Sequence, residues 1–280
     1  MATLEPIDLH HQCVERVIGS YVVDTDDGPA LFDCGPASTL DTLRRSVDLR
    51  EIRHLLLSHI HLDHAGATGV IVREHPHMTV HVSAIGAPHL VDPSRLEASA
   101  RRLYGDAFDT LWGELAPVPE ENVSVVGDVV LGLACFPTPG HASHHVCYLG
   151  RDGTLYAGDA AGVRIAPSEL VQPPTPPPEF DLDAWLATID ELERRAPERL
   201  ALVHFGVFDD VARHLGDLRR RLHEWSELVA GGATAEEFAR AVTDADGSYE
   251  LAMPVWQSYA GLKRWADKLT PSPSPASGGG

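Results

Sequence analysis

The sequence is poor in basic residues, and lysine is nearly absent. Its 280 residues include 22 lysines and arginines against 41 aspartates and glutamates, which gives a formal net charge of −19. Such a chain repels phosphate backbones and anionic membrane surfaces, so we expect neither nucleic acid nor a membrane as partner. Lysine occurs only at Lys263 and Lys268, so arginine must supply any earlier cationic contact to a substrate.

The sequence also lacks a cysteine framework and a long apolar run. Its four cysteines are scattered without a Cys-x-x-Cys pair, which argues against a disulfide scaffold or a cysteine-rich zinc site. No stretch approaches the roughly 18 uninterrupted apolar residues of a membrane span. Charged residues interrupt the N-terminus, where a secretory signal needs an apolar segment. We therefore predict a cytoplasmic protein.

The remaining composition is that of an ordinary globular protein, with 44% hydrophobic and 22% charged residues. Short β-branched runs alternate with stretches of helical periodicity, which predicts an α/β fold with sheets covered by helices. The predicted strands are Val14–Val23, Ala30–Phe32, Ile52–Leu57, Met78–Val82, Val123–Val126, Val129–Phe136, Val146–Leu149, Thr154–Tyr156 and Leu200–His204. The predicted helices are Ser38–Val47, Gly66–Glu74, Ser94–Glu114, one from Asp181 onward, Val207–Leu228, Ala235–Val242 and Pro254–Lys268.

A proline-rich segment at residues 173–178 cannot enter a helix or a central strand, so it is predicted to be a loop within one domain or between two. We favour a single domain over residues 1–270, because the strand Leu200–His204 lies beyond this loop and ends on a residue that the chemistry requires. Residues 271–280 contain only small residues and proline, and we predict a disordered tail there.

A cluster of metal-ligand side chains follows the third predicted strand. Residues 58–64 read SHIHLDH. Extended backbone points His59 and His61 to the same side, and a following turn brings Asp63 and His64 towards the same space. Four potential ligands therefore converge within a short segment.

Three further candidates end predicted strands beside glycine, namely His141, Asp159 and His204. Glycine lets the backbone approach closely there, so that a polar side chain projects from the sheet edge. Because a carboxylate can bridge two cations, a set of five histidines and two aspartates fits two metal ions better than one. The histidines expected to have no metal role are His10, His11, His54, His75, His77, His81, His89, His214 and His223.

With these motifs the sequence resembles the metallo-β-lactamase superfamily over roughly residues 14–210. The resemblance implies a four-layer αβ/βα sandwich with metals at one edge, and leaves residues 211–270 as a helical C-terminal extension. It implies that His59, His61 and His141 hold one metal, that Asp63, His64 and His204 hold the second, and that Asp159 bridges them. The family pattern also has an aspartate at the end of an early strand, here Asp33, which would orient the motif through hydrogen bonds. A simple turn-forming role before Gly35 is the alternative for Asp33.

One departure from the pattern concerns the subfamily. His144 stands where glyoxalase-II-like members usually carry glycine, which argues against a glyoxalase-type pocket, whereas His145 resembles a residue that supports a metal ligand. Within the glyoxalase-II-like branch, to which the resemblance assigns the chain, residues 138–145 look closest to a small, poorly characterised subgroup of dimeric metallohydrolases, which implies a homodimer. The tyrosine that lactonase members carry shortly after Asp159 is missing.

The resemblance favours a binuclear-zinc hydrolase in which a metal-bridging hydroxide cleaves a small ester, thioester or lactone. It implies two zinc ions per chain, with iron or manganese as alternatives. A competing hypothesis is a persulfide-dioxygenase-like enzyme with a single iron held by two histidines and one aspartate. A non-catalytic, dimeric metal-binding protein is a second alternative. The sequence identifies no general acid.

Residues 83–119 are predicted to form a substrate wall or a dimer contact. An apolar stripe in this segment fits either a buried helix face or an apolar pocket; its members are Tyr104, Phe108, Leu111 and Trp112. Four arginines are candidates for contact with an anionic group of the substrate. They are Arg95, Arg101, Arg102 and Arg164.

Overall fold

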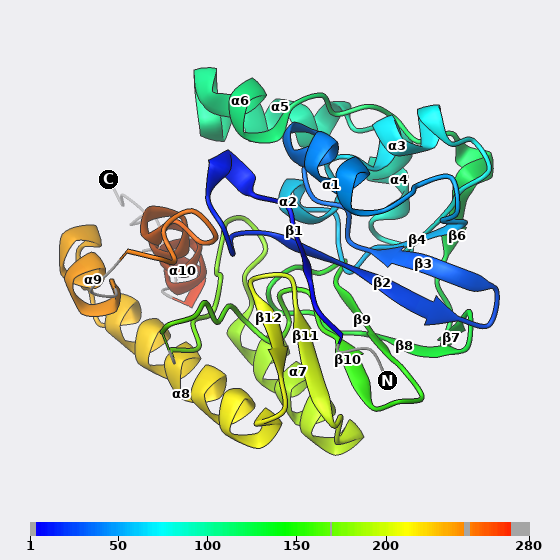
Figure 1. The fold of residues 1–280 in the computed structure, drawn as a ribbon. Helices are drawn as coiled ribbons and strands as arrows, with labels where there is room; N and C mark the ends of the chain where they lie inside the picture. Colours follow the sequence, from blue (N-terminus) through cyan, green and yellow to red (C-terminus); the bar gives the residue numbers. More distant parts are fainter. Residues whose placement is uncertain (1–3, 169, 244–246, 270–280) are drawn as a thin grey trace, which may run out of the picture.

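Two six-stranded sheets pack face to face in the computed structural model, and helices cover both outer faces (Figure 1). The structure describes residues 4–168, 170–243 and 247–269. The sandwich and its additional C-terminal helices confirm the predicted fold class. The predicted tail, residues 271–280, lies outside the described residues.

The first sheet is mostly parallel. Its strand order is β1-β2-β3-β4-β5-β6, with parallel pairing from β3 to β6. Because parallel strands end at the same edge, Asp33 after β3 and residues 58–64 after β4 lie beside each other. The strands are β1 (Ile7–Asp8), β2 (Gly19–Thr25), β3 (Gly28–Phe32), β4 (His54–Leu56), β5 (Thr79–Val82) and β6 (Val123–Val125).

The second sheet has the order β12-β11-β10-β9-β8-β7. Strand β10 is parallel to β11, and β9 is antiparallel to both β8 and β10, so β8, β10 and β11 all end at one edge. This edge carries His141, Asp159 and His204. The strands are β7 (Val129–Val130), β8 (Leu133–Pro137), β9 (Val146–Leu149), β10 (Thr154–Tyr156), β11 (Arg199–Leu202) and β12 (Gly206–Phe208).

Tyrosine hydroxyls join the two sheets close to that edge. The Tyr21 hydroxyl donates to the carbonyl oxygen of Leu202 at 2.7 Å, and the Tyr148 hydroxyl donates to that of Leu57 at 3.0 Å. Both tyrosines are fully buried, so these bonds satisfy polar groups that would otherwise cost about 1–3 kcal/mol each. Since the two acceptors lie two residues before His204 and His59, the bonds fix the strand ends from which the ligand residues project.

Helices pack on both outer faces of the sandwich. Helices α1 to α4 cover the first sheet, α7 and α8 cover the second, and α9 and α10 pack against α8 (Figure 1). Among the described residues, every helix is too short or too polar to span a lipid bilayer. The α-helices are α1 (Leu40–Ser46), α2 (Leu62–Ala65), α3 (Thr68–Glu74), α4 (Ala87–Val91), α5 (Ser94–Tyr104), α6 (Phe108–Trp112), α7 (Leu182–Arg195), α8 (Val211–Ala230), α9 (Ala235–Val242) and α10 (Val255–Leu269). Short 3₁₀ helices are η1 (His11–Cys13), η2 (Ala37–Thr39), η3 (Gly105–Ala107) and η4 (Glu120–Asn122).

Most predicted boundaries lie within two residues of the observed ones, but four predicted elements are interrupted or begin later, and backbone conformation explains two of these differences. The helix expected over 94–114 breaks where Gly105 adopts φ 54°, a conformation that favours glycine. The strand expected over 129–136 is a hairpin, because Leu131 (φ 51°) and Gly132 (φ 85°) turn the chain between β7 and β8.

The other two differences concern the start of β2, near the N-terminus, and the start of α8, after the last strand. The strand expected from Val14 begins only at Gly19, because the Asp8 carboxylate accepts hydrogen bonds from the backbone N–H groups of His10 and Arg16 and shapes the preceding residues into a loop. The helix expected from Val207 begins at Val211, because residues 206–208 pair with β11 as an edge strand.

Glycine contacts in two C-terminal helices allow a matched stability test. A Cβ added at Gly261 of α10 would clash with the Thr175 carbonyl oxygen, whereas one at Gly216 of α8 meets nothing within 4 Å. Gly261→Ala should therefore lower the free energy of unfolding by more than about 1 kcal/mol. Gly216→Ala should raise it by up to about 1 kcal/mol, because alanine favours a helix. Urea unfolding measures both changes, and equal effects would show that α10 does not pack as described.

Candidate metal centre

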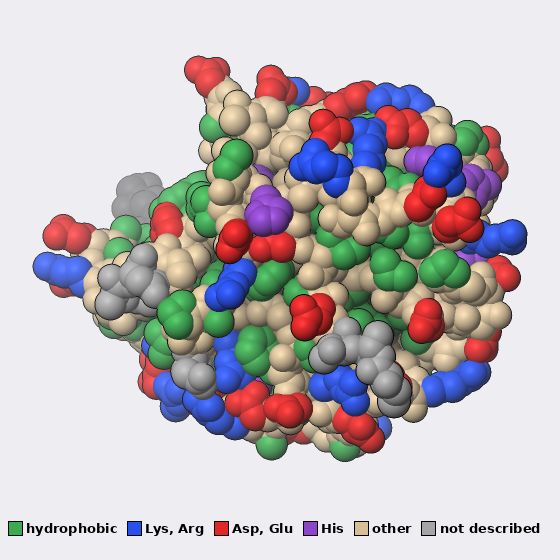
Figure 2. Space-filling view, viewed as in Figure 1, with side chains coloured by type: hydrophobic (Ala, Val, Ile, Leu, Met, Phe, Trp, Pro, Cys, Tyr) green, Lys and Arg blue, Asp and Glu red, His purple; other side chains and the backbone are tan. Residues whose placement is uncertain are grey.

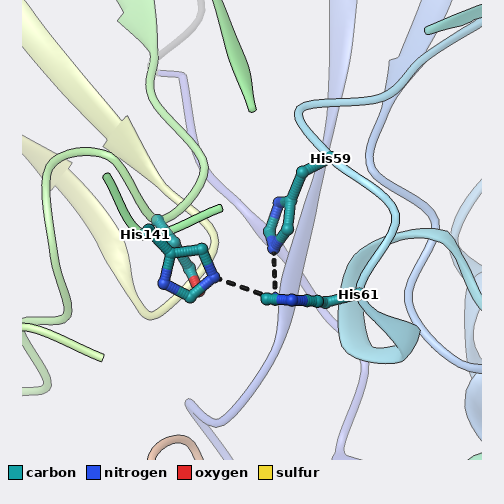
Figure 3. Close-up of side chains that lie close together, drawn as sticks. His59, His61 and His141 are labelled. Atoms are coloured by element: carbon teal, nitrogen blue, oxygen red, sulfur yellow. Dashed lines mark hydrogen bonds and ion pairs between the residues drawn. The ribbon is translucent and has the colours of Figure 1, made fainter. Parts of the chain in front are cut away.

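The seven predicted ligand side chains come together at the shared edge of the two sheets. In the first group, His61 Nδ1 lies 2.9 Å from both His59 Nε2 and His141 Nε2 (Figure 3). Asp159 belongs to the same group, with Oδ2 3.3 Å from His141 Nε2. All these ligand-type atoms lie within 4.8 Å of one another, close enough to surround one ion.

The second group consists of Asp63, His64 and His204, again within 4.8 Å of one another. Asp63 Oδ2 lies 3.4 Å from His204 Nε2 and 3.8 Å from His64 Nε2. Asp159 turns its other oxygen to this group, with Oδ1 3.3 Å from His64 Nε2 and 3.7 Å from His204 Nε2. One carboxylate therefore faces both groups, the position that a bridging ligand requires.

Most of the histidines are oriented by a hydrogen bond from the ring nitrogen that faces away from the site. His141 Nδ1 donates to the Pro174 carbonyl oxygen at 2.8 Å, and His204 Nδ1 donates to the Val17 carbonyl oxygen at 2.5 Å. Donation from Nδ1 leaves the Nε2 lone pair directed into the site. The proline-rich loop is therefore part of the site, since its backbone orients a predicted ligand.

Asp33 lies beneath the first motif and is fully buried. Its carboxylate accepts hydrogen bonds from the Ser58 N–H at 2.8 Å, the Ser58 hydroxyl at 2.6 Å and His64 Nδ1 at 2.7 Å. The Ser58 hydroxyl oxygen also lies 3.0 Å from His59 Nδ1 and can accept its proton. The side chain thus contacts the motif rather than its own turn, as the resemblance implied.

His145 supports the bridging position from the second sheet. Its Nε2 accepts the backbone N–H of Asp159 at 3.1 Å, and its Nδ1 donates to the Thr138 hydroxyl at 2.7 Å. Gly158 fits between these groups at φ 49°, because a Cβ there would lie 2.6 Å from the Ser58 side chain. The contacts explain why glycine precedes the aspartate.

The site concentrates charge where little water reaches. Burial, reinforced by neighbouring histidines, holds the pKa of His59 and His61 well below the usual value, so both rings are neutral and have a lone pair to offer. Burial opposes ionisation of Asp159 too, but His64 and His141 outweigh it and keep the pKa of that carboxyl well below its usual range. The carboxylates of Asp159, Asp63 and Asp33 raise the pKa of His64 despite its burial.

A cleft of about 580 Å³ opens over both groups. Helices α5 and α6 form one part of its wall, and residues between Glu250 and Ser258 form another. Of the predicted apolar stripe, Phe108 is buried beneath the wall, while Tyr104, Leu111 and Trp112 line the cleft. The stripe therefore serves partly as core and partly as pocket.

The candidate arginines divide into two kinds. Arg95 and Arg102 line the cleft. Arg101 instead forms ion pairs with two carboxylates of its own segment, and neither it nor Arg164 is among the residues that line the cleft. Arg164 is buried, with Nη1 2.7 Å from Asp210 Oδ1, so this candidate does not face the cleft.

Three residues of the cleft carry polar groups whose part in the site the sequence did not predict: His11, His144 and Glu179. His144 stacks against His59 at 5.9 Å between ring centroids, and burial lowers its pKa to about 4. Glu179 Oε2 lies 3.9 Å from His144 Nε2 and accepts hydrogen bonds from Ser143. His11 was expected to have no metal role, and it belongs to neither ligand group. No sequence motif marks His11 or Glu179, because separate loops bring them to the cleft, whereas His144 belongs to the segment of His141 and was noted only as a departure from the family pattern.

A four-layer sandwich with this cluster at its edge is typical of metal-dependent hydrolases of the metallo-β-lactamase fold. Residues 15–204 match the sequence model of the metallo-beta-lactamase superfamily, and the chain belongs to that superfamily. Members of the superfamily are mostly metal-dependent hydrolases. The resemblance in sequence is thereby confirmed at the level of the superfamily.

Sequence relatives are distant. The uncharacterised protein YobT of Bacillus subtilis (strain 168) is 25% identical over 198 residues, which cover 67% of this chain and 82% of the relative. A lactamase-like protein of Pestalotiopsis microspora is 27% identical over 146 residues, or 50% of this chain. The match spans only 37% of that second relative.

Solved structures share the fold at low sequence identity. An archaeal metallo-beta-lactamase superfamily protein from Sulfolobus tokodaii superposes with a TM-score of 0.68 at 20% identity, covering 93% of this chain and 96% of its own. A metallo-beta-lactamase family protein from Thermus thermophilus gives 0.67 at 19% identity, covering 95% and 93%. The protein TTHA1623, solved in a di-iron-bound form, gives 0.55 at 22% identity, covering 72% and 93%.

We predict that the Thr138 hydroxyl stabilises the fold through His145. Thr138→Val removes the acceptor for a buried ring N–H, which should lower the free energy of unfolding of metal-free protein by about 1–3 kcal/mol. Thr243→Val is the matched control, because that hydroxyl is exposed and, among the described residues, bonds to its own helix; it should change stability by less than about 0.5 kcal/mol. Equal effects of the two substitutions in urea unfolding would contradict the role given to His145.

Proposed function

We propose that this chain is a binuclear-zinc hydrolase that cleaves a small ester, thioester or lactone. One observation carries the proposal. Three buried ligand-type atoms, His64 Nε2, His204 Nε2 and Asp159 Oδ1, have no hydrogen-bond partner among the described residues, although they face one another. The side chains around the second group are thus arranged as metal ligands, but these three atoms lack hydrogen-bond partners.

A cation accounts for these unpaired atoms better than any other arrangement. Their separations of 3.3 and 3.7 Å exceed ordinary N–H···O hydrogen-bond distances. A buried polar atom without a partner costs about 1–3 kcal/mol, and three in one place argue for a bound group. Imidazole nitrogen and carboxylate oxygen are the ligands that zinc takes in catalytic sites. The donor set therefore fits the metal that the fold family implies.

The same observation weighs against the mononuclear-iron hypothesis. A single ion held by two histidines and Asp159 would leave Asp63, His64 and His204 buried or half-buried with no metal ion to bind. Iron or manganese in a binuclear site stays an alternative to zinc, and the similarly folded TTHA1623 has been solved in a di-iron-bound form. A purely structural metal is disfavoured because such sites are closed, whereas a cleft opens over this one.

Two bound zinc ions would lower the pKa of a coordinated water towards about 7 and polarise a carbonyl oxygen. The protein's part is to hold the ligands rigidly. Asp33 fixes the motif after β4, His145 fixes the backbone of Asp159, and the cleft walls exclude water from around the substrate. Leu96, Leu103 and Met253 in these walls favour a substrate with an apolar part, and Arg95 and Arg102 tolerate an anionic one.

Charge and size narrow the substrate further. On the face shown in Figure 2, acidic and basic side chains are interspersed and form no continuous basic surface. Together with the net charge of −19, this supports a small molecule rather than nucleic acid as substrate. The homodimer, the cytoplasmic location and the glyoxalase-II-like branch stay predictions.

Metal content should distinguish the bridging aspartate from the supporting one. Asp159→Asn should lose at least one of two metal ions per chain, because a neutral amide cannot bridge two cations as a carboxylate does. Asp33→Asn should keep both at saturating zinc with roughly 10- to 100-fold weaker affinity. Mass spectrometry of purified protein, with a zinc titration, measures the difference. Two full-affinity ions in both variants would show that Asp159 is not the bridge.

Hydrolysis should depend on the metal ligands. Zinc-loaded protein should turn over at least one of a panel of aryl esters, thioesters and lactones, and metal-stripped protein or His61→Ala should lose roughly 100-fold or more in kcat/KM. His223→Ala, an exposed histidine of α8, is the matched control and should match wild type. Turnover that survives His61→Ala would remove the hydrolase proposal. Oxygen consumption with a persulfide and one iron per chain would replace it with the iron enzyme.

A further inference from the structure

His11 is a buried polar side chain in the wall of the cleft that neither ligand group uses. It is 2% exposed and lines the cleft together with Asp63 and Trp112. Burial lowers its pKa, and Asp63 and His204 lie near enough to shift it further in opposite directions. The ring therefore shares the cleft with Asp63 of the second ligand group.

The backbone around His11 is strained in a way that fixes the ring's position. His10 (φ 49°), Gln12 (φ 55°), Cys13 (φ 63°) and Arg16 (φ 62°) all adopt the left-handed region that non-glycine residues avoid. The Asp8 carboxylate holds the loop by accepting two backbone N–H groups, and Gln12 Nε2 donates to the Thr110 carbonyl oxygen at 3.0 Å. Strain of this kind persists where surrounding contacts impose it, and it clusters at functional sites.

The ring is also held from the side. His11 stacks on Trp112 at 5.5 Å between centroids and 18° between planes, and Tyr104 packs edge-on against Trp112 at 5.1 Å. Nevertheless, His11 Nδ1 and Trp112 Nε1 are both buried with no hydrogen-bond partner among the described residues. A polar atom positioned so firmly and left unsatisfied beside a cleft points to a group that arrives with the ligand.

We propose that His11 is a substrate-binding residue whose imidazole hydrogen-bonds a second polar group of the substrate, close to the scissile carbonyl, at the side of the second ligand group. The inference rests on the proposed hydrolase function and narrows its substrate class. The preferred ester, thioester or lactone carries an oxygen or nitrogen one or two atoms from the carbonyl, and Trp112 holds the imidazole in place to meet it. A purely aliphatic acyl group leaves His11 unsatisfied and binds less well.

Two isosteric ligand pairs test this assignment. Methoxyacetate and butyrate differ by one oxygen in place of one methylene, and so do their 4-nitrophenyl esters. Calorimetric titration of zinc-loaded protein with the carboxylates measures binding without turnover, and the esters give kcat/KM. Ratios of wild type to variant cancel the intrinsic reactivity of the two esters.

His11→Phe keeps an aromatic ring on Trp112 and removes the nitrogens. This substitution should weaken methoxyacetate binding about tenfold and should lower kcat/KM for the methoxyacetate ester by a similar factor. Butyrate binding and kcat/KM for the butyrate ester should change by less than about twofold. His11→Asn, which retains a hydrogen-bonding group, should recover part of the loss and serves if the phenylalanine variant does not fold. His10→Asn, an exposed neighbour in a left-handed conformation that asparagine tolerates, should behave as wild type. Metal content should be two ions in every variant.

The outcomes separate this inference from the proposed function. If His11→Phe weakens binding and turnover equally for the methoxyacetate and butyrate ligands, or loses metal, His11 has a structural role and the assignment is wrong. The assignment is also wrong if His11→Phe binds and turns over methoxyacetate ligands as wild type does, or if wild type binds neither carboxylate. If wild type binds methoxyacetate through His11 but hydrolyses no ester, thioester or lactone, the hydrolase proposal fails while the binding role stands.

Discussion

The buried carboxylate of Asp33 is the contact on which the geometry of the site depends. It receives a backbone N–H and a hydroxyl from Ser58 and a ring N–H from His64, so one side chain fixes both ends of the motif that follows β4. Because Asp33 itself ends the neighbouring parallel strand, the position of the ligands is set by strand pairing rather than by loop packing. The second sheet repeats this arrangement with His145, which fixes the backbone of Asp159 from the adjacent strand.

Joining these two halves has an electrostatic cost that the fold alone does not offset. Asp33, Asp159 and His64 are almost completely buried, and buried charges require partners. Hydrogen bonds satisfy Asp33, but Oδ1 of Asp159 and Nε2 of His64 face each other unpaired. A site that is rigid, desolvated and incompletely satisfied is preorganised for cations, since binding them requires little further ordering of the protein.

The sequence predicted the fold class and the convergence of the seven ligand-type residues because both depend on local rules. Side chains that end parallel strands share an edge, and residues two apart in extended backbone share a side. The cleft was not predictable in the same way. Arg164 lies five residues after Asp159 in the sequence, yet its side chain is buried and pairs with Asp210 instead of facing the cleft. His11 lies far upstream of the motif in a loop without any recognisable pattern, and contacts distant in the sequence, such as its packing on Trp112, bring it to the cleft.

The candidate metal ligands and the walls of the cleft therefore depend on different parts of the chain. The metal-ligand groups lie at the ends of hydrogen-bonded strands, where a change of register would displace several of them together. The cleft walls come from α5, α6, the η1 loop and the segment before α10, and each can change without disturbing strand pairing. The candidate metal site thus lies on the part of the chain with the fewest degrees of freedom, and the cleft that would receive the proposed substrate lies on the part with the most. The strained backbone of residues 10–16 fits this division. A strand is held in place by hydrogen bonds to its neighbouring strands, whereas this loop depends on side-chain contacts to hold the His11 imidazole in one position.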